Sequence, residues 1–260
     1  MTAAGAPAVL AEGLRKTYGA ATAVAGLDLV VPAGQVFGFL GPNGAGKSTT
    51  IAMLCTLLRP DAGRAEVGGH DVLRHPDEVR RAIGLVFQET TLDQDLTAEE
   101  NLRFQADLYG VPRARARAAI DGLLGMVGLA ERRRTPVRAL SGGMRRRLEI
   151  VRALLHAPRV LFLDEPTTGL DPQSRAVVWE HLHRLRREQD ITVFLTTHHL
   201  AEAEHCDGIA IMDHGRLVAQ GTPEELKAAV GPTLDDVFLH HTGRTIRDEV
   251  RAADWAGARG

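Results

Sequence analysis

Four short apolar runs are the clearest pattern along this chain. They occupy residues 36–40, 83–87, 160–163 and 191–195. Runs of this length that are apolar on both faces are typical of strands buried between two layers of helices. The pattern therefore predicts an α/β fold with a mainly parallel sheet.

Between the second and third runs the hydrophobic period becomes helical. Thr97 can cap a helix there, and Glu100 can reach back to it as a capping box. We place an α-helical insert at about residues 90–157. Thr222, followed by a proline and two glutamates, predicts another capped helix near the end of the chain. A short C-terminal extension is expected over residues 230–260.

The stretch GPNGAGKSTT lies directly after the first apolar run and before an apolar helical stretch at residues 51–58. Glycines in this context let backbone amides turn toward a phosphate at a helix N-terminus, so the stretch predicts a P-loop. Lys47 is expected to reach the β and γ phosphates of a nucleoside triphosphate, and Ser48 to hold Mg²⁺. A glycine-rich turn with a chance lysine is the alternative. The predicted contacts are Gly41, Pro42, Asn43, Gly44, Ala45, Gly46, Lys47, Ser48 and Thr49.

Two adjacent carboxylates follow the third apolar run. Asp164 is the candidate Mg²⁺ anchor, and Glu165 is the candidate general base that activates a water for attack on the γ phosphate. A solvated acidic turn is the alternative. The glutamate favours hydrolysis over nucleotide sensing.

A second phosphate-binding surface is predicted inside the helical insert. Ser141, Gly142 and Gly143 open an amphipathic helix, with Ser141 as its N-cap. An ordinary capped helix is the alternative. One P-loop already satisfies a triphosphate, so a second clamp implies a second subunit.

In kind and order these motifs resemble those of the ATP-binding subunits of ABC transporters, over about residues 10–228. The resemblance implies a RecA-like P-loop NTPase core, a small β subdomain and an inserted helical subdomain, together forming an ATP-binding domain of residues 1–229. It gives Tyr18 an adenine-stacking role. It makes Gln88 a contact for Mg²⁺, for the attacking water and for the membrane partner. Asp171 falls in an inter-subunit loop, and His198 is the switch histidine.

The resemblance also implies partners. Two chains, most simply two identical ones, would pair head to tail, with each ATP between the P-loop of one chain and the signature helix of the other. A separate transmembrane permease would hold the pair at the cytoplasmic side of the cell membrane. Within the family, the stretches SGGMRRRL, THHLAEAE and TLDDVFL resemble drug exporters of the daunorubicin-resistance type. The implied cargo is a drug, an antibiotic or a lipid-like compound. An importer motor or a non-transport ABC-type ATPase is the alternative.

Composition narrows these options. A net charge of -2 gives no general attraction to nucleic acid, and two cysteines are too few for a disulfide framework, which indicates a reducing compartment. Prolines and glycines interrupt the longest uncharged stretch, residues 29–46, so we expect no membrane helix there. We also expect no signal peptide.

Only 53 positions separate Gln88 from Ser141, which leaves no room for the long coiled coil of the DNA-repair ATPases.

Two further groups invite other interpretations. The arginine runs at residues 132–134 and 145–147 lack interleaved aromatic residues, so we interpret them as solvated faces without a nucleic-acid partner. His198, Glu202, His205 and Cys206 have helical spacing, but no second ligand cluster accompanies them to complete a metal site.

Overall fold

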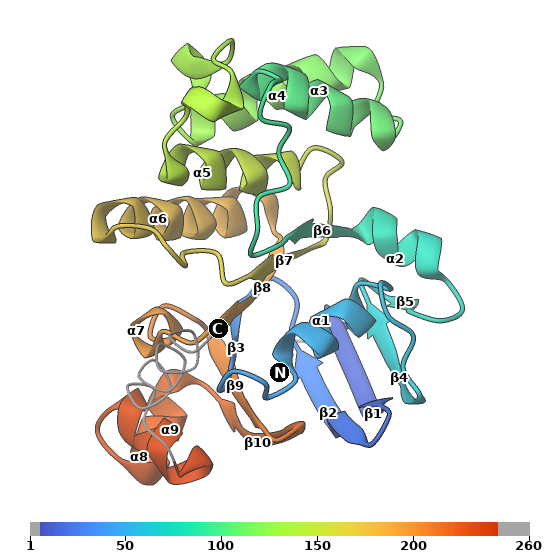
Figure 1. Cartoon of the computed structure of the whole chain (residues 1–260), viewed down its shortest axis with the longest axis vertical. Coiled ribbons are helices and arrows are strands. Elements are labelled where there is room, and N and C mark those ends of the chain that lie inside the picture. Colours follow the sequence, from blue (N-terminus) through green and yellow to red (C-terminus); the bar gives the residue numbers. More distant parts are fainter. Residues whose placement is uncertain (1–5, 244–260) are drawn as a thin grey trace.

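A six-stranded sheet forms the centre of the molecule in the computed structural model, which describes residues 6–243 (Figure 1). The strand order is β10-β9-β3-β8-β7-β6, and all neighbours run parallel except β9 and β10. The strands are β3 (Val36–Leu40), β6 (Ile83–Val86), β7 (Val160–Asp164), β8 (Thr192–Thr197), β9 (Gly208–Asp213) and β10 (Arg216–Gly221). The predicted α/β fold with a mainly parallel sheet is confirmed.

The four predicted runs become four adjacent strands of this sheet, β3, β8, β7 and β6. Four of their ends differ from the prediction by one or two residues, and two of these differences have a clear cause. Strand β8 continues to Thr197, because Thr196 and Thr197 pair with the end of β3 and are buried there. Strand β6 stops at Val86, and Phe87 is 42% exposed. The carboxyl ends of these parallel strands still lie at the same edge of the sheet, and the P-loop begins at this edge.

A smaller antiparallel sheet packs beside the central one. Its order is β2-β1-β4-β5, with β1 (Val9–Tyr18), β2 (Ala21–Val31), β4 (Ala62–Val67) and β5 (His70–Asp71). Phe37 and Phe39 of β3 share a buried cluster with Leu14 and Leu27 of this sheet. Helix α1 (Lys47–Leu54) adds Ile51 to the same cluster, and it ends four residues before the predicted helical stretch does. The cluster fixes the P-loop between the two sheets.

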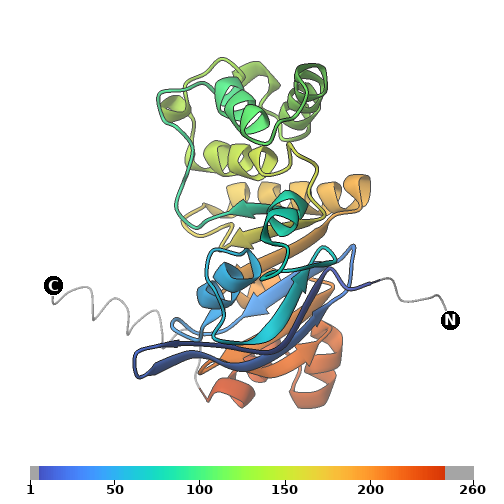
Figure 2. The ribbon, with the colours of Figure 1, turned by 90° about the vertical axis from the view of Figure 1, so that its right-hand side faces the viewer.

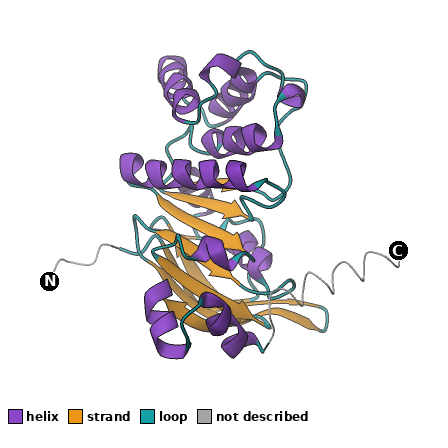
Figure 3. Cartoon of the chain, turned by 90° about the vertical axis from the view of Figure 1, so that its left-hand side faces the viewer, coloured by secondary structure: helices purple, strands orange, loops and turns teal. Residues whose placement is uncertain are grey.

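Helices α3 (Ala98–Leu108), α4 (Arg113–Met126) and α5 (Gly142–Arg152) lie together at one end of the molecule. The long helix α6 (Pro172–Gln189) separates them from the strands (Figures 2 and 3). The predicted capping box of Thr97 and Glu100 opens α3. Two short 3-10 turns, Ala130–Arg132 and Val137–Ala139, connect α4 to α5.

The remaining helices are α2 (Pro76–Ala82), α7 (Leu200–Ala203), α8 (Pro223–Val230) and α9 (Leu234–Thr242). The capping box at Thr222 opens α8, as predicted. Helix α9 lies in the predicted C-terminal extension, and its Val237 and Phe238 are buried in the main core. The described part of the extension is therefore packed against the domain. Residues 244–260 lie outside the described residues.

Candidate active site

A cavity of about 230 Å³ lies at the carboxyl edge of the central sheet. This edge of an α/β sheet is where ligands bind, because loops from separate strands converge there. The strand ends of β3, β6 and β7 bring the predicted residues of three distant segments together. The lining is Ala23, Asn43, Gly44, Gly46, Lys47, Ser48, Thr49, Gln88 and Glu165.

Close packing explains why glycine occupies two positions of the loop. Gly41 has φ +155° and Gly46 has φ +107°, backbone conformations that residues with a Cβ rarely adopt. A Cβ on Gly41 would lie 2.2 Å from the carbonyl oxygen of Met212, and one on Gly46 would lie 2.2 Å from that of Ala23. Lys47 Nζ donates to the carbonyl oxygens of Gly41 (2.6 Å) and Pro42 (2.9 Å). The loop is thus held in a curved form around its lysine.

Thr196, at the end of β8, fixes the acidic end of β7. Its hydroxyl donates to Asp164 Oδ1 at 2.5 Å and accepts from the backbone N–H of Glu165 at 3.0 Å. This role of Thr196 was not predicted from the sequence. The available signal was a hydroxyl residue near the carboxyl end of a buried strand, one strand away from the two carboxylates.

Glu165 lines the cavity, and His198, which lies outside the lining, contacts its carboxylate. His198 Nδ1 lies 3.1 Å from Glu165 Oε1, and the Thr168 hydroxyl donates to Glu165 Oε2 at 3.0 Å. The hydrogen bond with His198 is the main reason that the pKa of Glu165 lies below its usual range. Burial opposes this shift, and the positive charge of Lys47 supports it. The carboxylate is therefore ionised at neutral pH, as a general base requires.

The backbone of Glu165 is itself unusual. Its φ is +46°, a left-handed conformation that is uncommon for residues other than glycine. Such conformations persist only where the surrounding structure enforces them, and they gather at active sites. Here the N–H bond to Thr196 is one of the contacts that hold the residue.

Comparison with known proteins agrees with this geometry. The family model described as ABC transporter matches residues 24–168, more than half of the chain. The daunorubicin/doxorubicin resistance ATP-binding protein DrrA of Streptomyces peucetius is 50% identical over 234 residues, which are 90% of this chain and 71% of DrrA. This chain belongs to the ABC transporter family, as an ATP-binding subunit. ATP-binding subunits of this family are ATPases, and so is this chain.

Two further proteins support the family assignment. The Nod factor export ATP-binding protein I of Ralstonia nicotianae is 48% identical over 221 residues, covering 85% of this chain and 68% of that protein. The structure of cbiO1 from Clostridium perfringens, part of the ABC transporter complex cbiONQ, superposes with a TM-score of 0.80 at 30% identity. The superposition covers 86% of this chain and 91% of the cbiO1 chain. The shared fold is the ATPase domain of an ABC transporter.

The signature residues of this ABC subunit form a second group. Ser141 caps α5 by accepting from the N–H of Met144 at 3.3 Å, as predicted. A Cβ on Gly143 would lie 2.7 Å from the hydroxyl of Ser174 on α6. Asp171 accepts from that same residue, at its N–H (2.9 Å) and its hydroxyl (2.6 Å), and so caps α6. The signature helix and the Asp171 loop are therefore packed against each other.

This second group does not line the P-loop cavity of its own chain. Tyr18 does not line it either. Its ring is 52% exposed at the end of β1, with Lys16 Nζ 5.9 Å from the ring centre. The roles that the resemblance gives to Ser141, Asp171 and Tyr18 therefore stay predictions.

One prediction about the signature helix is wrong. The run at residues 145–147 was expected to be a solvated face, yet Arg146 is only 7% exposed, and Arg147 is partly buried and donates to the carbonyl of Val127 at 2.6 Å. Arg146 faces the ends of β6 and β7 and Arg147 faces the end of α4, where carbonyl groups need donors. A helical wheel shows only that one face of the helix is polar. It cannot tell whether that face meets water or buried carbonyl groups.

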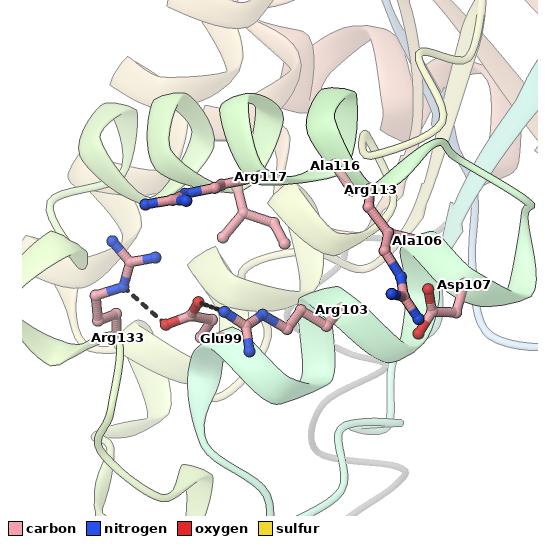
Figure 4. Close-up of a pocket in the computed structure, with 9 residues that line it drawn as sticks. Glu99, Arg103, Ala106, Asp107, Arg113, Ala116, Arg117 and Arg133 are labelled. Atoms are coloured by element: carbon pink, nitrogen blue, oxygen red, sulfur yellow. Dashed lines mark hydrogen bonds and ion pairs between the residues drawn. The ribbon is translucent and has the colours of Figure 1, made fainter.

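In the other arginine run, Arg133 has acidic partners on the surface of the insert. Arg133 pairs with Glu99 at 2.8 Å and with Asp121 at 2.9 Å. It lines a cavity of about 280 Å³ between α3 and α4, into which Arg103 and Arg117 also project (Figure 4). The carboxylates of Glu99 and Asp107 lie among the arginines of this lining, which differs from the uniformly basic surface of a nucleic-acid site.

Glu202, a member of the helically spaced group, has a structural role. Its buried carboxylate accepts hydrogen bonds from the hydroxyls of Thr167 and Thr197, the latter at 2.9 Å. It thereby joins the loop that follows β7 to the end of β8. Within residues 6–243, no three histidine, cysteine or acidic side chains come together as metal ligands.

Proposed function

We propose that this ABC ATPase drives the export of a drug, an antibiotic or a lipid-like compound through a separate membrane subunit. The cavity that gathers the P-loop, Gln88 and the ionised Glu165 is the observation that carries the motor role. Relatives named for daunorubicin resistance and Nod factor export support the direction and the class of cargo.

The chemistry of hydrolysis follows from the positions of these residues. Lys47 and the loop amides bind the phosphate chain, with the α1 N-terminus adding partial positive charge. Glu165 takes a proton from water as the water oxygen bonds to the γ phosphorus and the bond to the β-phosphate oxygen breaks, which yields ADP and phosphate. The bond between Glu165 and His198 keeps the acceptor oxygen in place.

The residues also fit Mg²⁺. Ser48, Asp164 and Gln88 offer a hydroxyl, a carboxylate and an amide oxygen, all of the hard-oxygen type that this ion prefers. The bond from Thr196 orients Asp164 for such a role. When bound, Mg²⁺ would neutralise charge on the phosphates.

We infer a head-to-tail pair of chains from the separation of the two phosphate-binding groups. Ser141 to Gly143 open an 11-residue helix, whose N-terminal amides favour an anion, but they lie outside the P-loop cavity of the same chain. A second copy of the chain would bring its signature helix to the nucleotide. The packing of Gly143 on Ser174 supports one combined surface made of the signature and the Asp171 loop.

The contact with the membrane subunit is proposed at a third cavity, of about 280 Å³, which is distinct from the one between α3 and α4 and lies on the side of the P-loop domain next to the helical insert. Leu57, Phe87 and Tyr109 line it and are 58%, 42% and 38% exposed, an unusual apolar group for a surface. Phe87 is the residue before Gln88, so an apolar segment inserted here would act directly on the active site. No helix within residues 6–243 is long and apolar enough to cross a membrane. We place the subunit at the cytoplasmic face, held by its permease.

The test is co-purification from native membranes, using the Glu165→Gln chain held in ATP and Mg²⁺. A polytopic membrane protein that is lost with Leu57→Ser but kept with Leu239→Ser supports the proposal, because Leu239 is 44% exposed on the distant helix α9. Ribosomes or DNA in place of a membrane protein would contradict a transport role. Efflux from vesicles that contain both subunits then tests export against import.

A further inference from the structure

Helix α5 contains a buried ion pair between Arg146 and Glu149. The side chains are 8% and 3% exposed, and Arg146 Nη1 lies 3.2 Å from Glu149 Oε2. Burying two charges is costly, and an apolar pair of similar volume is often as stable. Fold stability alone therefore gives weak grounds for such a pair, and its other contacts indicate what it does.

The guanidinium of Arg146 brackets the catalytic glutamate. Its Nε donates to the carbonyl oxygen of Pro166 at 2.7 Å, and its Nη2 donates to that of Asp164 at 3.0 Å. These two residues are the chain neighbours of Glu165 on either side. Two bonds from one rigid, planar group thus fix the strained backbone that aims the Glu165 side chain.

The same pair holds the loop that carries Gln88. Arg146 Nη1 donates to the carbonyl oxygen of Phe87 at 2.6 Å. Glu149 Oε1 accepts from the backbone N–H of Thr91 at 2.8 Å. Gln88 lies between these two anchored positions, so the pair grips the chain on both sides of it.

We propose that Arg146 and Glu149 are positioning residues for ATP hydrolysis, which hold Glu165 and Gln88 in their reactive arrangement. Both belong to the helix that begins at the signature motif, at Ser141. A shift of this helix against a bound nucleotide therefore moves the backbone at both catalytic residues together. The positioning role rests on the ATPase activity alone, whereas the link to the signature motif also rests on the proposed pairing of two chains.

The first experiment compares ATP hydrolysis by Arg146→Lys, Arg146→Met and Glu149→Gln with that of the parent chain. We expect kcat to fall by about tenfold to a hundredfold, the scale of a misplaced catalytic group, with the Kd for ATP within about twofold of the parent. Arg146→Lys should retain more activity than Arg146→Met but less than the parent chain, because one ammonium group cannot replace the planar guanidinium that donates to three carbonyls. Arg138→Met is the matched control, since Arg138 lies in the same insert but is 66% exposed. An unchanged kcat in all three variants would overturn the proposal.

A double-mutant cycle separates positioning from a merely structural role. If Arg146 acts through Glu165, Arg146→Met should cause little further loss of single-turnover rate in the Glu165→Gln chain. If the rate losses of Arg146→Met and Glu165→Gln multiply in the double variant, Arg146 does not act through Glu165. If Arg146→Met fails to fold, the lysine variant and Glu149→Gln, which preserve size, carry the cycle. The pairing is tested separately by dimer formation in ATP. An unchanged kcat in variants that still dimerise would overturn the positioning role alone, whereas a lost kcat in a chain that never dimerises would overturn the pairing alone.

Discussion

The P-loop and the signature helix are both helix N-termini suited to phosphate, but they are held in opposite ways. The P-loop curves around its own lysine, since Lys47 bonds to carbonyls of the same loop, while Gly41 and Gly46 fit closely against the carbonyls of Met212 and Ala23. The signature helix is held from a distance. Gly143 packs on α6, and Arg146 bonds to the ends of two strands.

This difference separates binding from coupling. Because Lys47 is held by carbonyls of its own loop, the loop can bind nucleotide without a change in the catalytic segments. A helix that is bonded to both catalytic segments cannot move without disturbing them, which suits it to link a second chain to the chemistry. Variants of each region should therefore fail differently.

The largest effect is expected from Lys47→Ala. Removing the buried ammonium leaves the phosphate chain without its main counter-charge, and the loop without two internal bonds. We expect ATP binding to be abolished, as measured by calorimetry, with a folded domain by circular dichroism. Retained ATP affinity would undermine the assignment of the P-loop.

Glu165→Gln should preserve binding and remove chemistry. The amide keeps the shape of the side chain but cannot accept the proton, so we expect hydrolysis to slow by about a hundredfold or more. ATP-bound dimers should then accumulate, which light scattering can detect. Full turnover would mean that another group activates the water, and a strictly monomeric variant would count against the pairing of two chains.

The same contrast explains how far the sequence could be interpreted. Motifs defined by backbone form, such as the P-loop and the helix caps at Thr97, Ser141 and Thr222, were predictable because their geometry is local. The strands of the antiparallel sheet were not predicted individually, since β1 is exposed along much of its length and shows no continuous apolar run. The burial of Arg146 was not predicted because the carbonyl groups that it bonds to lie 18 to 59 residues away in the sequence.

His198→Ala should change the pH dependence of hydrolysis. The bond with His198 is the largest cause that lowers the pKa of Glu165, and burial acts in the opposite direction. Without the histidine the pKa rises, so the carboxylate becomes protonated at a higher pH as the solution is acidified. We expect the acidic limb of kcat to shift upward relative to the parent, measured with Arg138→Met as the unaffected reference. If the acidic limb of the kcat profile stays at the pH of the parent chain, the protonation of Glu165 does not control that limb.

The smallest effect is expected from Gly143→Ala, which tests the distant support of the signature helix. The added methyl would lie 2.7 Å from the Ser174 hydroxyl and 3.0 Å from its Cβ, so α5 and α6 must separate slightly. Overpacking of this kind typically costs about 1–3 kcal/mol. We expect a modestly lower unfolding temperature and unchanged ATP affinity at the P-loop, with weaker dimer formation in the Glu165→Gln background. Because the methyl is added far from the cavity, lost ATP affinity in the isolated chain would show that the two regions are less independent than their contacts indicate.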